Sequence, residues 1–214
     1  ETLHATQRQS VQVGPLLRGY LHMGTSPRFM ALALASGIPF NGMFLYVLSA
    51  PVWLGDILQL QPTQFFWFFC MSVSGIMLGA WLSGRLAGRI KPKHQIRHGF
   101  VIMLGTSLAN VAMNLLGTPH PFWAMLTVSI FSFGWALMVP VVTLLVLDMV
   151  PERRGMASSV QAFIGSMANG LVAGVIAPLV MHSAAALALT SLGMLGIGVV
   201  AWILWEATQR LAAP

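Results

Sequence analysis

Six long apolar segments occupy most of this chain and restrict it to very few folds. They cover approximately residues 29–51, 64–86, 99–116, 122–147, 155–181 and 184–205. A bilayer core of about 30 Å needs about 20 apolar residues to cross it as a helix. Continuous apolar runs favour helices over the alternating pattern of a membrane β-barrel. The sequence therefore predicts an all-α membrane protein with six transmembrane helices.

The overall composition agrees with a chain that lives in lipid. Hydrophobic residues make up 57% of the 214 positions and charged residues only 7%, with a net charge of +6. A water-soluble fold would have too few polar side chains to cover its surface. The lipid bilayer is thus the first partner that the sequence predicts.

The basic residues all fall on one side of the predicted spans. They lie in an arm at 1–28, in the second-to-third and fourth-to-fifth connections, and in a tail at 207–214: Arg8, Arg18, Arg28, Arg85, Arg89, Lys91, Lys93, Arg97, Arg153, Arg154 and Arg210. The opposite side carries only Asp56, His120 and His182. Because Lys and Arg are retained on the cytoplasmic face, both termini are expected to be cytoplasmic. The segment 29–206 is then a single transmembrane domain.

The densest basic stretch, Leu82 to Gly99, does not indicate a nucleic-acid site. It holds five of the eleven basic residues, but it lacks aromatic residues between them on which bases could stack. Its charge is explained by membrane orientation, with attraction to anionic lipid headgroups as a physical consequence. No nucleic-acid partner is expected.

The predicted spans contain no ionisable residue far from their ends. Buried acids, bases and histidines mark proton relays, metal sites and haem sites in membrane proteins. The chain also shows no nucleophile with an obvious base. We therefore expect no catalytic residue, no metal, no cofactor and no enzymatic activity, and we expect any proton coupling to depend on residues outside this chain.

Small residues recur every four positions on two of the predicted helices. Gly75 and Gly79 lie on the second, and Ser166, Gly170 and Gly174 lie on the fifth. Such stripes let two helix backbones approach closely in lipid. They are interpreted as helix-packing sites, and the alternative is a sliding contact with a helix of a partner.

A few polar side chains fall at membrane depth, among them Asn41, Tyr46, Gln161 and Asn169. An amide in lipid must either find a hydrogen-bond partner or face a cavity. The sequence alone leaves both interpretations open.

Two stretches resemble a known family. Phe40 to Pro51, followed by Pro62 to Phe66, resembles the seventh span and outer loop of the Bcr/CflA-type drug/proton antiporters of the major facilitator superfamily. Ser83 to Arg89, followed by Lys91-Pro92-Lys93, is similar to that superfamily's glycine- and arginine-rich inner loop. The resemblance implies one half of a twelve-helix fold, namely the second, C-terminal half.

The resemblance also implies a function and a site. The first and fourth helices of this half would line a central cavity, and the second and fifth would form its lateral wall. The implied cavity residues are Asn41, Phe44, Tyr46, Leu48, Phe131, Trp135, Gln161 and Asn169. They would take small hydrophobic or cationic drugs, exchanged for protons through an N-terminal six-helix half, in the bacterial inner membrane.

Two hypotheses remain beside this interpretation. One is a cytoplasmic ion-pair latch in which Arg85 and Arg89 pair with Asp148 or Glu152. The other concerns the class of protein: the chain could instead be a free-standing six-span half-transporter acting as a dimer, or a non-transporting subunit of a membrane assembly or receptor.

Overall fold

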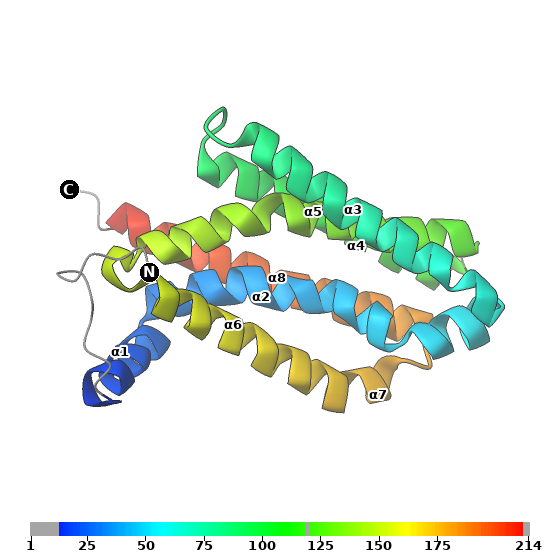
Figure 1. The fold of residues 1–214 in the computed structure, drawn as a ribbon. Coiled ribbons are helices and arrows are strands. Elements are labelled where there is room, and N and C mark those ends of the chain that lie inside the picture. Colours follow the sequence, from blue (N-terminus) through cyan, green and yellow to red (C-terminus); the bar gives the residue numbers. More distant parts are fainter. Residues whose placement is uncertain (1–12, 119, 212–214) are drawn as a thin grey trace.

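The computed structural model describes residues 13–118 and 120–211, and these form helices and no strand (Figure 1). Six helices are long and apolar enough to cross a membrane. The expected all-α architecture with six candidate membrane helices is therefore confirmed. The α-helices are α1 (Val13–Thr25), α2 (Pro27–Leu48), α3 (Phe66–Leu86), α4 (Pro92–Leu116), α5 (Pro121–Asp148), α6 (Arg154–Leu171), α7 (Ala177–Val180) and α8 (Ala184–Leu211).

Several boundaries differ from those expected from hydropathy. Helix α4 begins at Pro92, well before the apolar run at 99–116, because proline favours a first helical position and the helix continues beyond its apolar part. The expected connection at 52–63 is partly helical, since Pro51–Ile57 forms a π-helical segment that buries Trp53 and Leu54. The expected arm at 1–28 contains α1, while its residues 1–12 lie outside the described part.

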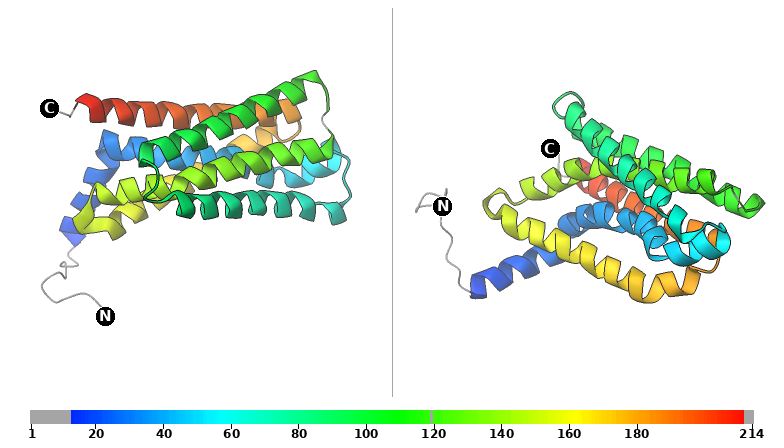
Figure 2. Two further views of the ribbon diagram at one scale, coloured as in Figure 1. Left: turned by 90° about the horizontal axis from the view of Figure 1, so that it is seen from above. Right: turned by 45° about the vertical axis from the view of Figure 1, so that its right-hand side comes forward.

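The helix bundle is built around α2 and α5. Helix α2 packs against α8, α5 and α6, and helix α5 packs against α3 and α4. Helices α3 and α6 lie on opposite sides of this centre in Figure 1 and in the right-hand view of Figure 2. In the most apolar 18-residue stretch of each span, 56% of the residues are buried for α2, but only 22% for Pro62–Leu86 and 11% for Pro151–Val180. The helices on these two sides therefore expose most of their apolar surface.

Glycines set the closest helix contacts. A Cβ atom on Gly79 would lie 2.4 Å from the carbonyl oxygen of Phe133, and one on Gly75 would lie 2.3 Å from that of Ser129. These distances leave no room for a side chain, so α3 and α5 meet backbone to backbone. By contrast, no atom of the residues that the structure describes lies within 4 Å of the corresponding positions on Gly170 and Gly174. The first stripe of small residues packs inside this chain, and the second faces open space.

One buried amide ties three helices together near one end of the bundle. The side chain of Gln95 on α4 donates to Ser83 Oγ on α3 at 2.7 Å and to the Leu137 carbonyl oxygen on α5 at 2.9 Å. Gln95 is only 2% exposed, so loss of its amide would leave buried polar partners unsatisfied. This end of α3, α4 and α5 is thus held in one register.

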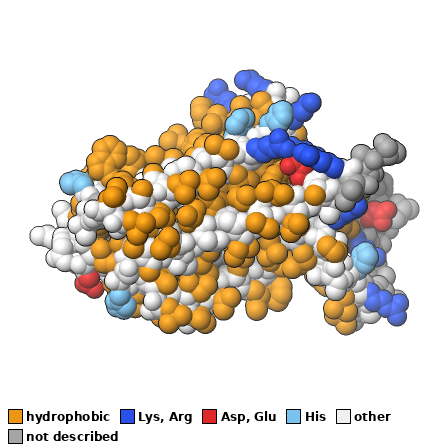
Figure 3. Space-filling model, turned by 180° about the vertical axis from the view of Figure 1, so that it is seen from behind, with side chains coloured by type: hydrophobic (Ala, Val, Ile, Leu, Met, Phe, Trp, Pro, Cys, Tyr) orange, Lys and Arg blue, Asp and Glu red, His pale blue; other side chains and the backbone are white. Residues whose placement is uncertain are grey.

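The basic side chains gather at one end of the bundle, while the surface between the ends is largely apolar (Figure 3). The start of α1, the α3–α4 and α5–α6 connections and the end of α8 all lie at this end (Figure 1). Arg8 lies outside the described residues. The end that carries the basic connections is called the basic end below.

The glycine contacts lead to a stability prediction. Gly79→Val should lower the unfolding temperature of the chain in detergent, at a cost of about 2 kcal/mol or more, because the added carbons collide with backbone atoms of α5. Gly174→Val is the matched control, since its new side chain meets open space. Thermal unfolding followed by intrinsic tryptophan fluorescence measures both. Equal unfolding temperatures for the two variants would contradict the close α3–α5 contact.

Candidate functional site

A groove of about 340 Å³ lies between α2, α5 and α6. Its lining combines aromatic, aliphatic and small polar side chains: Ser36, Gly37, Phe40, Trp135, Val139, Thr143, Ser158, Gln161, Ala162, Gly165 and Asn169. Trp135, Gln161 and Asn169 are among the residues that the sequence placed in a cavity. The structure brings these three together on one lining.

Aromatic rings form one wall of the groove. The rings of Phe40 and Trp135 lie 4.9 Å apart between centroids, and Phe44 stacks on Phe40 at 5.5 Å. Phe40 and Phe44 share a face of α2 because residues four apart are neighbours on a helix. Leu48 follows one turn later and is partly buried against the core. Phe40 and Trp135 thus give the groove an apolar wall in which the two rings are tilted by 47° to each other.

Polar groups gather around the same groove. The indole Nε1 of Trp135 donates to the Ser36 carbonyl oxygen at 3.0 Å. The amide of Gln161 donates to Ser36 Oγ at 3.1 Å and to Thr143 Oγ1 at 3.4 Å, which links α6 to α2 and α5. Within the described part of the chain, the buried Oδ1 of Asn169 has no hydrogen-bond partner. The groove thus contains a hydrogen-bond acceptor that its own side chains leave unsatisfied.

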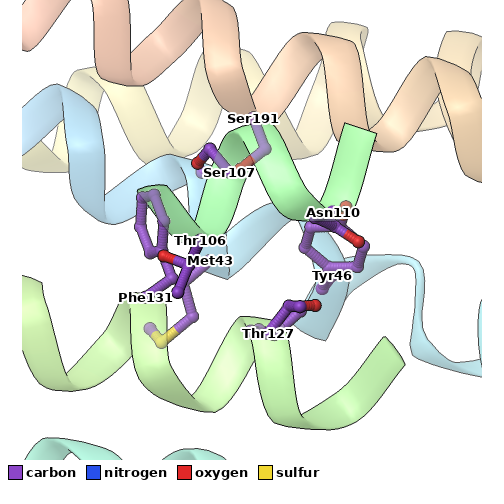
Figure 4. A pocket seen from close by; sticks show the side chains of 10 residues that line it. Met43, Tyr46, Thr106, Ser107, Asn110, Thr127, Phe131 and Ser191 are labelled. Atoms are coloured by element: carbon purple, nitrogen blue, oxygen red, sulfur yellow. Dashed lines mark hydrogen bonds between the residues drawn. The ribbon is translucent and has the colours of Figure 1, made fainter. Parts of the chain in front are cut away.

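Other predicted cavity residues lie inside the bundle. Asn41 is 1% exposed and donates to the Gly37 carbonyl oxygen of its own helix. Tyr46 is also buried, and its hydroxyl accepts a 2.6 Å hydrogen bond from Asn110 (Figure 4). Phe131 lines the same small interior pocket as Tyr46. None of these three lines the groove.

For one of the predicted latch residues, Asp148, the structure shows a partner other than Arg85 or Arg89. Asp148 forms its ion pair with Arg154 at 2.9 Å, and both side chains are exposed. Arg85 lies over the ring of Trp81 at 4.8 Å, on the outer side of α3. Glu152 lies in the short helical turn Pro151–Arg153 between α5 and α6. Asp148 is therefore paired with a basic residue six positions further along the chain and not with one from α3.

Ser36, Phe40 and Thr143 were missed by the sequence analysis, although they contribute to the groove. The signal for Phe40 was its spacing of four residues from both Ser36 and Phe44. Gln161, Gly165 and Asn169 show the same spacing on α6. These spacings define a shared face, but they do not show which neighbouring helix that face meets.

A larger hollow of about 500 Å³ lies between α3 and α5. Its lining contains Trp67, Cys70 and Phe133 but no amide or charged side chain. It offers apolar surface with few groups that could orient a ligand, so the α2–α5–α6 groove is the better candidate site. Among residues 13–118 and 120–211, no group of three or more His, Cys, Asp or Glu side chains could hold a metal ion.

The fold and groove define a class of protein: a multi-pass helical membrane protein with a partly polar groove between its spans. The family model of the Major Facilitator Superfamily matches residues 2–173, and the chain belongs to this superfamily.

Two curated proteins are similar in sequence to parts of this chain. The MFS-type transporter YdgK of Bacillus subtilis strain 168 is 26% identical over 181 residues, which are 84% of this chain and 44% of YdgK. The enterobactin exporter EntS of Escherichia coli O1:K1 is 30% identical over 120 residues, which are 56% of this chain and 27% of EntS. The chain thus spans less than half the length of either relative.

The pairing of Asp148 can be measured with a double-mutant cycle. Asp148→Asn and Arg154→Gln should couple by about 0.2–1 kcal/mol in the free energy of unfolding, because exposed ion pairs are weak. The pair Asp148→Asn and Arg85→Gln is the control and should be additive. Equilibrium unfolding in mixed micelles measures the cycle. Stronger coupling of Asp148 to Arg85 than to Arg154 would contradict this pairing and support the latch expected from the sequence.

Proposed function

We propose that this chain is the C-terminal half of a transporter that exports small hydrophobic or cationic molecules. The transporter would be of the Bcr/CflA type, would lie in the bacterial inner membrane and would keep both termini in the cytoplasm. The groove between α2, α5 and α6 would form this half's share of the central binding cavity. The observation that carries the proposal is the combination of the Phe40–Trp135 wall with the amides of Gln161 and Asn169.

The chemistry of the groove suits such substrates. Aromatic faces bind organic cations through cation–π attraction and bind apolar rings by burial. A small number of polar groups, such as the Gln161 amide, would orient the ligand without restricting it to one compound. The similarity to EntS, which is named an exporter, supports export as the direction of transport.

The location of the groove fits a cavity shared with a second half. The span Pro151–Val180, which contains α6, is the least buried of the spans, and its exposed face carries the small residues Ser166, Gly170 and Gly174. Such a face allows another helix to approach closely. An N-terminal six-helix half would cover it, and rocking of the two halves would give alternating access to the groove.

Proton coupling would then be a property of the N-terminal half. The six apolar segments of this chain carry no acid, base or histidine away from their ends. Ionisable groups at membrane depth are the usual proton carriers in transporters. Gln161 and Asn169 would contact the substrate but would not exchange protons.

Efflux of ethidium, an aromatic cation, tests the proposal. Trp135→Ala in the intact gene, expressed in a pump-deleted bacterium, should slow ethidium efflux about fivefold, because the substrate loses a ring that contributes about 1 kcal/mol of cation–π attraction. Trp123→Ala is the matched control, since Trp123 lies on the same helix, is 56% exposed and does not line the groove. Fluorescence of preloaded cells measures the rate.

Two results would argue against this function. If the intact gene changed neither ethidium efflux nor the susceptibility to a panel of cationic and neutral drugs, drug export would be rejected. If Trp123→Ala slowed efflux as much as Trp135→Ala, the groove would not be the binding site. Self-association of this chain into a stable dimer that transports alone would favour the free-standing half-transporter.

A further inference from the structure

A small pocket of about 10 Å³ lies inside the bundle, where α2, α4, α5 and α8 meet (Figure 4). A site of about 10–15 Å³ has room for one water molecule. Most of the lining side chains carry an oxygen atom: Tyr46, Thr106, Ser107, Asn110, Thr127 and Ser191. The pocket shares no residue with the α2–α5–α6 groove, so the proposed transport function does not account for it.

The pocket lies well inside the end of the bundle that is opposite the basic end. Asn110 precedes the end of α4 at Leu116 by six residues, and Thr127 follows the start of α5 at Pro121 by six residues. At 1.5 Å of rise per residue, this depth is about 9 Å. A hydroxyl group buried there needs a hydrogen-bond partner in the protein or a bound water.

Three hydroxyl groups of the lining have hydrogen-bonding capacity left over. Tyr46 accepts a hydrogen bond from Asn110, but its own hydroxyl proton has no acceptor among the described residues. Ser107 is 4% exposed, and its buried Oγ has no partner in the described part of the chain. Ser191 is also 4% exposed, and its Oγ forms no hydrogen bond with a described residue. The threonines of the lining already donate to carbonyl oxygens of their own helices.

The three groups reach the pocket from three helices (Figure 4). Ser107 precedes Asn110 by three residues, so both side chains share one face of α4. Ser191 of α8 lies against α2, because its Oγ is 2.9 Å from the position that a Cβ atom on Gly42 would take. Tyr46 follows Gly42 by four residues and therefore lies one turn away on the same face of α2.

We propose that this pocket binds one water molecule that joins α2, α4 and α8. The water would accept the hydroxyl proton of Tyr46 and would form further hydrogen bonds with Ser107 and Ser191. Three hydrogen bonds are typical of a buried water. An apolar ligand would leave these hydroxyl groups unpaired, and a cation would find no carboxylate among the lining residues. Water therefore fits both the size and the chemistry of the pocket.

X-ray radiolysis of the full chain in detergent, followed by mass spectrometry, tests the bound water. Ionisation of a bound water releases a hydroxyl radical, which oxidises the side chains beside it. Met43 lines the pocket and Met125 does not, yet both are 6% exposed. Met43 should therefore be oxidised severalfold faster than Met125. Ser107→Val should abolish this difference, because the larger apolar side chain fills the space of the water.

Thermal unfolding distinguishes a hydroxyl group that binds water from one that is simply unpaired. Ser107→Ala should lower the unfolding temperature by about 3 °C, because the water and the protein lose a hydrogen bond. Ser72→Ala is the matched control, since Ser72 is also 4% exposed, its Oγ has no partner in the described part of the chain, and it does not line the pocket. Its loss should leave the unfolding temperature unchanged or raise it, because an unpaired buried hydroxyl group is removed.

Several outcomes would overturn the proposal. Equal oxidation of Met43 and Met125 would mean that no water is held in the pocket. Equal shifts of the unfolding temperature in Ser107→Ala and Ser72→Ala would mean that the Ser107 hydroxyl group is unpaired. A higher unfolding temperature in sodium chloride than in choline chloride, lost in Ser107→Ala, would mean that the occupant is a cation. None of these outcomes bears on ethidium efflux, so this proposal and the proposed transport function fail independently.

Discussion

Close backbone contact between helices is the constraint on which the rest of this structure depends. In lipid, burial of apolar side chains gives little drive for helix association, so contact distance and hydrogen bonds decide which helices pair. Gly75 and Gly79 bring α3 onto the carbonyl groups of α5, and Gly99 and Gly134 do the same for α4 and α5. The ring of Pro39 occupies the space where a Cβ atom on Gly198 would lie, so α8 packs closely against α2. These contacts place α5 and α2 at the centre.

The position of the candidate site follows from the looser packing of α6. Helix α6 approaches the centre less closely, since a Cβ atom on Gly37 of α2 would lie 3.6 Å from the Cα atom of Gly165. Gln161 joins α6 to Ser36 and Thr143 by hydrogen bonds at 3.1 and 3.4 Å. Its continuation, Val172–Ile176, is π-helical, a form that often occurs at functional sites. The groove therefore lies between a tightly packed centre and a loosely packed helix, which suits a binding site whose walls must move.

Particular residues show where prediction from sequence reached its limit. Hydropathy located the apolar helices, and the four-residue spacing of Gly75 and Gly79 marked a face of α3 that lies against backbone atoms of α5. Asn41 and Gln161 are both amides at membrane depth, and the sequence offered the same alternatives for each. The structure turns Asn41 onto the carbonyl group of Gly37 and places Gln161 in the groove. Their rotational position on the helix, relative to neighbours distant in the chain, made the difference.

The sequence by itself determined that the chain forms apolar helices and that its basic residues share one end. Both follow from local chemistry, because every backbone polar group must be satisfied within lipid and charged side chains remain outside it. Only the tertiary structure decided which faces meet. It paired Asp148 with Arg154 and buried Tyr46 against Asn110. These outcomes depend on steric fit between distant helices, which no local pattern of residues encodes.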